Sequence, residues 1–155
     1  MRIVVLVGLP GSGKSTYLEQ LGVAGLSSDA IRGLLADDEN DQTIHERVFE
    51  TLRYLLRQRL ALKRPVTYID ATNLTLRERR PYLSIGAAFG CEVEALFFDA
   101  PLEVCLARNA SRERVVPAEA LAKMQERLEP PSTAEGFARV TRISQPDAEL
   151  RIRDC

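Results

Sequence analysis

The residues best suited to chemistry form a glycine-rich loop near the start of the chain, Gly8-Leu9-Pro10-Gly11-Ser12-Gly13-Lys14-Ser15-Thr16. The loop matches the pattern G-x-x-x-x-G-K-[ST] and lies between a predicted strand and a predicted helix, as that pattern requires. Backbone N–H groups in such a loop surround phosphate oxygens, and the helix N-terminus favours their negative charge. We therefore expect residues 8–16 to bind a nucleoside triphosphate rather than to form an ordinary strand–helix turn.

The side chains of this loop have separate expected roles. Lys14 should be exposed and reach the β- and γ-phosphates, while the Ser15 hydroxyl should ligate Mg²⁺. The other residues expected to contact the nucleotide within the loop are Gly11, Ser12, Gly13 and Thr16. The loop thus predicts ATP, or another nucleoside triphosphate, and Mg²⁺ as cofactors.

A second candidate site pairs a carboxylate with a guanidinium one helical turn apart, at Asp29 and Arg32. Asp29 could accept the proton of an attacking hydroxyl, and Arg32 could bind an anionic group on the same acceptor. The alternative is a helix cap followed by a solvated arginine. A pure nucleotide switch would not need this pair, so it favours phosphoryl transfer to an acceptor.

A second carboxylate, Asp70, ends an apolar run over residues 66–69. Such a position is often near Mg²⁺ and its waters, so we expect Asp70 to bind the metal through water. Thr72 and Asn73 follow it and are assigned to the acceptor, although Asp, Thr and Asn are also common turn residues. Three arginines come next: Arg77, Arg79 and Arg80. They either contact the acceptor or lie on an exposed helix surface, and we assign Arg79 to the acceptor.

Another group of arginines surrounds a break between two predicted helices, over residues 110–116. A mobile lid there could place an arginine over the transferring phosphate, with Arg112 as the first choice and Arg108 as a second donor contact. Arg114 fits a solvated basic surface better. His45, within a long predicted helix, is interpreted as structural or solvated.

Strands and helices alternate along the chain. Apolar runs predict strands over residues 2–7, 23–26, 66–69, 93–98 and 137–143, the pairing of the last being undetermined. Helical spacing and stop residues predict helices from residue 14 onwards and over residues 28–35, 43–64, 76–89, 101–109 and 117–128, with Pro81 in a first turn or at a kink. The fold class is α/β: a parallel sheet with helices on both faces, a mobile lid, and ligands at the carboxyl ends of the strands.

Length and composition narrow the class further. The 155 residues, 45% hydrophobic and 28% charged, fit a single domain over residues 1–155. The net charge of −1 argues that any nucleic-acid contact is local. Apolar runs are too short to cross a membrane and no secretory pattern is present, so we expect a cytoplasmic protein. Three cysteines without C-x-x-C spacing do not predict disulfides or a zinc site.

Taken together, these motifs resemble the kinase domain of the polynucleotide 5′-kinase family, within a wider group of small P-loop kinases. The resemblance covers most of the chain. It rests on the glycine loop and on three further motifs in the same order: Asp29-x-x-Arg32, Asp70-x-Thr-Asn-Leu and Arg108-Asn109-x-x-Arg112.

The resemblance implies that Asp29 is the general base for a nucleotide 5′-hydroxyl, that Arg32 binds the neighbouring phosphate and that Arg112 is a lid arginine. We thus expect an ATP- and Mg²⁺-dependent kinase whose acceptor is a 5′-hydroxyl end of DNA or RNA. Two alternatives stay open: a kinase for a small molecule such as a metabolite, antibiotic or nucleotide sugar, and a nucleotide switch or ATPase without an acceptor. The sequence does not determine the oligomeric state.

Overall fold

The computed structural model describes residues 1–111 and 115–144. Strands and helices alternate over this part of the chain, as expected. In chain order the elements are β1 (Arg2–Val7), α1 (Lys14–Leu21), β2 (Leu26–Ser27), α2 (Ser28–Ala36), the 3₁₀ helix η1 (Gln42–Ile44), α3 (His45–Ala61), β3 (Val66–Asp70), α4 (Leu76–Phe89), β4 (Glu92–Phe98), α5 (Leu102–Ala110), α6 (Ala118–Arg127), the 3₁₀ helix η2 (Thr133–Glu135) and β5 (Arg139–Ile143).

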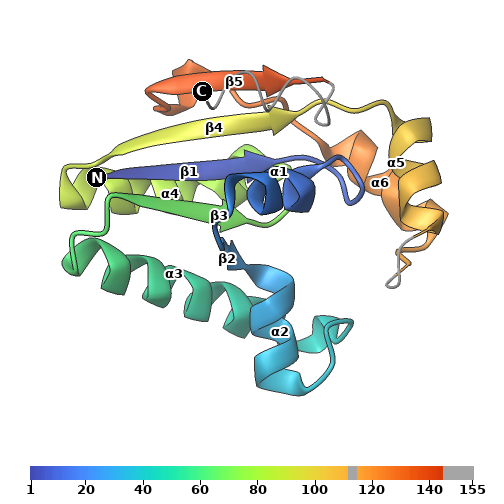
Figure 1. Ribbon diagram of the computed structural model, residues 1–155, viewed down its shortest axis with the longest axis horizontal. Helices are drawn as coiled ribbons and strands as arrows, with labels where there is room; N and C mark the ends of the chain where they lie inside the picture. Colours follow the sequence, from blue (N-terminus) through green and yellow to red (C-terminus); the bar gives the residue numbers. More distant parts are fainter. Residues whose placement is uncertain (112–114, 145–155) are drawn as a thin grey trace.

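The five strands form one parallel sheet in the order β2-β3-β1-β4-β5. β1 pairs with both β3 and β4, and its residues from Ile3 to Val7 are at most 2% exposed. This continuous apolar run is typical of a parallel strand that is covered on both faces. All strands point the same way, so the loops that follow β1, β2 and β3 meet at one edge of the sheet (Figure 1).

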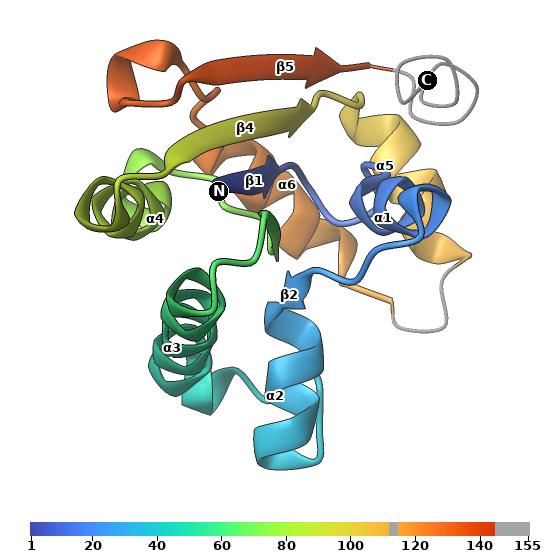
Figure 2. The ribbon, with the colours of Figure 1, turned by 60° about the vertical axis from the view of Figure 1, so that its left-hand side comes forward.

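Different helices cover the two faces of the sheet. On one face, Ile3 and Val5 of β1 pack in a cluster with Leu52 of α3 and Tyr82 of α4. On the other face, β1 packs with α1 through the cluster that contains Tyr17. In Figure 2, α3 and α4 lie apart from α1, with the strands between them. The predicted α/β class, with helices on both faces of a parallel sheet, is confirmed.

The second strand is shorter than predicted and begins later. β2 has only two residues, which pair with the end of β3 as Leu26 with Ile69 and Ser27 with Asp70. The hydroxyl of Ser27 caps α2 by accepting a hydrogen bond from the Ala30 N–H at 3.1 Å, so Asp29 is not the helix cap that the sequence left open as an alternative. Asp29 therefore lies in the first turn of α2 and is not its N-cap.

Other boundaries differ from the predictions for local reasons. α3 ends at Ala61 rather than residue 64, because Lys63 adopts the left-handed conformation (φ 57°) before Pro65. Pro81 lies in the second turn of α4, where it cannot donate to the helix, and α4 nevertheless continues to Phe89. The last strand, β5, pairs in parallel with β4 at the edge of the sheet. Along the described residues, none of the helices is both long and apolar enough to cross a membrane.

Candidate active site

The glycine-rich loop follows β1 and leads directly into α1, as predicted. Gly11 and Gly13 have positive φ angles of 83° and 107°. A Cβ atom on Gly11 would also lie 2.8 Å from the carbonyl oxygen of Cys105 in α5, so both conformation and space require glycine there. The N–H of Gly8 donates to the Thr72 carbonyl at 3.0 Å, which joins this loop to the β3–α4 loop beside it.

Lys14 is buried within the loop rather than exposed. Its Nζ donates to the carbonyl oxygens of Gly8 and Leu9 at 2.7 and 2.8 Å, and the residue is 8% exposed. These hydrogen bonds hold the ammonium group inside the curve of the loop, where phosphate oxygens would enter. The expectation of an exposed side chain was wrong, because the loop carbonyls converge on Nζ.

The hydroxyls of the loop face in different directions. Ser15 and Thr16 are exposed and line the large cleft described below. Ser12 is 1% exposed, its N–H donates to the Leu9 carbonyl at 3.1 Å and its Oγ lies 3.5 Å from Lys14 Nζ. The structure thus leaves Ser15 and Thr16 open to a nucleotide and a metal ion, and uses Ser12 to shape the loop.

A cleft of about 1870 Å³ lies at the carboxyl edge of the sheet. It extends from the glycine-rich loop past the start of α2 to the first turns of α3 and α4, and α5 and α6 also contribute to it. Of the residues singled out in the sequence, the cleft is lined by Gly11, Gly13, Lys14, Ser15, Thr16, Asp29, Arg32, Asp70, Thr72, Asn73, Arg77 and Arg108. Motifs up to 97 residues apart therefore meet in one cavity.

Asp29 and Arg32 form an ion pair in this cleft. Nη1 of Arg32 lies 3.0 Å from Oδ1 of Asp29, with side-chain exposures of 5% for Arg32 and 43% for Asp29. Among the described residues, Nε of Arg32 is buried and has no hydrogen-bond partner. A buried donor without a partner is costly, so this nitrogen is suited to binding an acceptor atom of a ligand.

Asp70 lies at the end of β3, close to both Lys14 and Asp29. Burial raises the pKa of Asp70 above its ordinary value of 3.8, and the charge of Asp29 raises it further, while Lys14 opposes the shift. A cation at Asp70 would favour its ionised form and offset the cost of burial.

Mg²⁺ fits this arrangement. Within residues 1–111 and 115–144, no three His, Cys, Asp or Glu side chains form a cluster that could hold a metal ion. Mg²⁺ is commonly held by one or two protein oxygens together with substrate phosphates and water. Ser15 and Asp70 would supply those oxygens, and a metal there would neutralise charge on the phosphates.

The β3–α4 loop contributes less to the acceptor than predicted. Thr72 is half-buried and lines the cleft. Asn73 is 2% exposed, and its side-chain Nδ2 donates to the carbonyls of Leu6 at 2.7 Å and Ala71 at 3.3 Å. The side-chain amide of Asn73 thus ties the loop to β1 instead of facing an acceptor, and its left-handed conformation (φ 49°) forms the turn.

Arg79 does not contact the cleft, so its assignment to the acceptor was wrong. It is 0% exposed and forms an ion pair with Glu135, with Nε and Oε1 separated by 2.9 Å. Its position three residues before Tyr82 and six before Ile85 places it on the buried face of α4. That apolar spacing could have revealed the burial, and it leaves the exposed Arg77 as the α4 arginine that lines the cleft.

Of the three arginines at and beyond the end of α5, Arg108 lies within the described residues. Nη1 of Arg108 donates to the Gly11 carbonyl at 3.4 Å, which brings this side chain to the glycine-rich loop. Arg112 and Arg114 lie outside the described residues, so the role of Arg112 on the donor phosphates stays a prediction.

Sequence reasoning missed the contribution of α3. His45, Phe49 and Arg53 line the cleft at four-residue spacing, and the rings of His45 and Phe49 are 4.8 Å apart. This stripe lies beside the apolar stripe of α3 and could have been found from the same helical periodicity.

The fold is that of a P-loop kinase domain. Residues 3–131 match the AAA domain family AAA_33, and the chain belongs to that family. Its curated relatives and structural neighbours include kinases that act on different substrates.

Two curated relatives match most of this chain. The L-seryl-tRNA(Sec) kinase of Methanococcus maripaludis is 26% identical over 138 residues, which cover 84% of this chain and 54% of the relative. The bifunctional polynucleotide phosphatase/kinase of Schizosaccharomyces pombe is 25% identical over 148 residues, covering 91% of this chain and 33% of the relative. The chain thus spans about half of the first relative and a third of the second.

Two solved kinase structures share the fold. A sugar kinase from Janibacter sp. superposes with a TM-score of 0.69 and 24% identity, covering 99% of this chain and 92% of that one. The Mycobacterium tuberculosis APS kinase, in complex with AMPPNP and APS, superposes with a TM-score of 0.63 and 20% identity, covering 99% of this chain and 95% of that one.

Proposed function

We propose that this protein is an ATP- and Mg²⁺-dependent kinase that transfers the γ-phosphoryl group to the 5′-hydroxyl of a polynucleotide end. The observation that carries this proposal is the Asp29–Arg32 ion pair, which lies in the same cleft as the glycine-rich loop and presents a partly exposed carboxylate. A nucleotide switch needs no such pair, whereas a kinase needs a base for its acceptor.

The donor half of the cleft supports ATP and Mg²⁺. The glycine-rich loop would hold the phosphates through its N–H groups, with Lys14 in the curve of the loop and Arg108 beside Gly11. The metal, held by Ser15 and through water by Asp70, would draw charge from the phosphates during transfer. The APS kinase neighbour binds AMPPNP, an ATP analogue, on the same fold.

The acceptor half supports a hydroxyl that is followed by a phosphate. Asp29 would take the proton of the attacking hydroxyl as its oxygen bonds to the γ-phosphorus and the bond to the leaving ADP oxygen breaks. Arg32, already paired with Asp29, would offer its unpartnered Nε to an oxygen of the neighbouring phosphate.

The names of two curated relatives favour a nucleic-acid acceptor. One name includes a tRNA and the other a polynucleotide. The cleft of about 1870 Å³ is larger than the roughly 300–1,000 Å³ of ordinary small-molecule pockets, so it has room for an acceptor of either kind beside the nucleotide.

A small-molecule kinase is the second candidate, because the cleft is lined by acidic side chains as well as basic ones. Glu46 and Glu50 of α3 line it next to Arg53. Carboxylates there would repel a long phosphate backbone and would bind hydroxyl groups of a compact acceptor. A polynucleotide would then be held at its terminal nucleotide only.

The decisive experiment measures transfer of labelled γ-phosphate to a panel of 5′-hydroxyl oligonucleotides, nucleoside 3′-phosphates and small alcohols, with nucleotide hydrolysis followed in parallel. We expect the dominant product to be a 5′-phosphorylated oligonucleotide. A dominant small-molecule product would select the second candidate, and hydrolysis alone would contradict both.

A further inference from the structure

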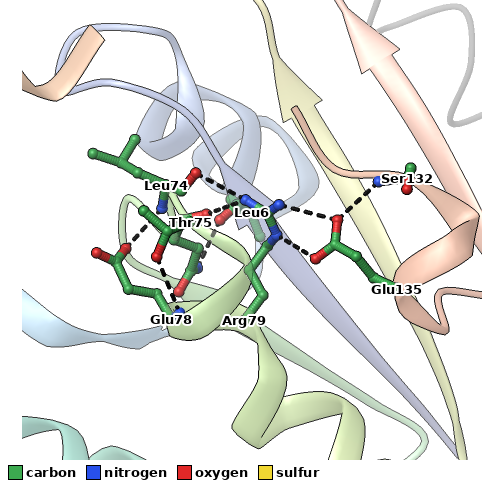
Figure 3. Close-up of polar contacts among 8 residues, drawn as sticks. Leu6, Leu74, Thr75, Glu78, Arg79, Ser132 and Glu135 are labelled. Carbon is green, nitrogen blue, oxygen red and sulfur yellow. Dashed lines mark hydrogen bonds and ion pairs between the residues drawn. The ribbon is translucent and has the colours of Figure 1, made fainter. Parts of the chain in front are cut away.

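The guanidinium of Arg79 joins two segments that are distant in the sequence (Figure 3). Its Nε and Nη2 donate to Oε1 and Oε2 of Glu135 at 2.9 and 3.0 Å, across a separation of 56 residues. The two side chains are 0% and 6% exposed. This is a buried, bidentate ion pair between α4 and the short helix η2. The proposed reaction does not use it directly.

The third nitrogen of the same guanidinium holds the β3–α4 loop. Nη1 of Arg79 donates to the carbonyl oxygens of Asn73 at 2.9 Å and Leu74 at 3.0 Å. Asn73 is in the left-handed conformation, so these carbonyls belong to the turn that follows Asp70 and Thr72. Because the guanidinium is planar and rigid, fixing its position on Glu135 also fixes where these two carbonyls lie.

Leu74 is held from two more directions. Its N–H donates to Oε2 of Glu78 at 2.8 Å, and its carbonyl also accepts the N–H of Glu129 at 2.9 Å. Its side chain, 1% exposed, packs with Leu9 of the glycine-rich loop and Leu121 of α6. The turn therefore contacts the glycine-rich loop, α4 and the segment that follows α6.

Glu135 is also held by a hydrogen bond within its own segment. The N–H of Ser132 donates to Oε2 of Glu135 at 2.9 Å, as part of a capping box around η2. Burial of an ion pair gives little net stability compared with a well-packed apolar pair. Stability alone thus gives no particular reason for an ion pair here, whereas placement of the turn does.

We propose that Arg79 and Glu135 are positioning residues, which fix the turn over residues 73–74 and through it set Asp70 and Thr72 for the metal and the acceptor. This inference rests on the proposed kinase function for its chemical consequence. The connection is short: Thr72 adjoins the turn and its carbonyl accepts the Gly8 N–H, and Asp70 ends the strand just before it. Active-site groups have to be held within roughly 0.5 Å of their working positions, so a loosened turn should impair the metal site.

The first test variant is Glu135→Gln, which keeps the size of the side chain and removes its charge and one of its two acceptor oxygens. We expect the Mg²⁺ concentration for half-maximal transfer to rise about tenfold and kcat to fall by about 10- to 100-fold, the range seen when groups that support a metal site are altered. The affinity for nucleotide without metal should stay within about twofold, because the glycine-rich loop is intact.

A second variant removes the ion pair without leaving one charge buried alone. Arg79→Met combined with Glu135→Leu replaces both charged side chains by apolar ones. It also removes the hydrogen bonds to the Asn73 and Leu74 carbonyls and to the Ser132 N–H, so we expect a lower melting temperature. Measured well below that temperature, the Mg²⁺ dependence should show the same shift as in Glu135→Gln. This double variant also keeps the inference testable if Glu135→Gln does not fold.

The matched control is Arg2→Gln, which breaks another ion pair between distant segments, that of Arg2 with Glu94 at 2.8 Å. Arg2 begins β1 at the amino edge of the sheet, opposite the cleft. This variant should lower the melting temperature and leave the half-saturating Mg²⁺ concentration unchanged.

Two readouts keep the inference distinct from the proposed function. Mn²⁺ affinity in the presence of ADP, measured by electron paramagnetic resonance, should weaken about tenfold in Glu135→Gln and in the double variant. Amide exchange over residues 71–75 should accelerate in both. Unchanged Mn²⁺ affinity and exchange would overturn the positioning role whether or not transfer occurs, whereas absence of transfer by the wild-type protein would contradict only the proposed kinase function.

Discussion

Arg32 offers the sharpest test of the proposed acceptor site. Its guanidinium is 5% exposed, Nη1 pairs with Asp29 at 3.0 Å, and Nε has no partner among the described residues. Arg32→Lys keeps the positive charge and can still pair with Asp29 through one nitrogen. It removes the second donor that we assign to an acceptor phosphate.

The size of the effect follows from the single charged hydrogen bond that Arg32→Lys removes. A hydrogen bond to a charged group contributes about 1.5–3 kcal/mol, and about 1.4 kcal/mol corresponds to a factor of ten. Arg32→Lys should therefore lower kcat/KM for a nucleoside 3′-phosphate by roughly 10- to 150-fold. For the same nucleoside without the phosphate, the loss should stay below about threefold, because the deleted donor then has no partner.

The assay compares kcat/KM for the two acceptors at saturating Mg²⁺ and ATP, in wild type and variant. Arg139→Lys is a matched control, since Arg139 is 71% exposed and pairs only at 3.6 Å with Glu94. That control should change neither value by more than about twofold. Equal losses on both acceptors in Arg32→Lys would refute the phosphate contact and favour the small-molecule kinase.

Three further perturbations test the rest of the site. Lys14→Ala should abolish transfer while the circular dichroism spectrum stays native, and a folded variant with wild-type transfer would remove the glycine-rich loop as the donor site. Asp29→Asn should lower kcat by roughly 10²–10⁴-fold with nucleotide affinity retained, measured by single-turnover transfer and by titration of a fluorescent nucleotide; full activity would exclude Asp29 as the base. Asp70→Asn should raise the melting temperature of the metal-free protein at pH 7, because burial raises the pKa of Asp70 and the wild-type fold loses stability as the pH rises through that raised value. This gain should disappear below pH 3.8, where the wild-type carboxyl is also neutral, and a gain that does not depend on pH would contradict its electrostatic origin.

Features encoded by adjacent residues were predicted well. The glycine-rich loop appears where the motif placed it, because positive φ angles at Gly11 and Gly13 are local requirements. α4 has the predicted bounds because Thr75 caps its start and Gly90, with φ 67°, ends it. The convergence of Asp29 and Asp70 on this loop also followed from the sequence, since the carboxyl ends of parallel strands share one edge.

The tertiary structure decided which polar side chains face the cleft. Asn73 and Arg79 carry polar groups of the kind that bind an acceptor, yet both are buried. Their hydrogen-bond partners, the Leu6 carbonyl of β1 and the Glu135 carboxylate, come from 67 and 56 residues away. Lys14 is turned inward by carbonyls of its own loop. The sequence alone determined the α/β fold and the glycine-rich loop through periodicity and local turn geometry, whereas the directions of the Asn73 and Arg79 side chains depended on which distant groups could satisfy them on burial.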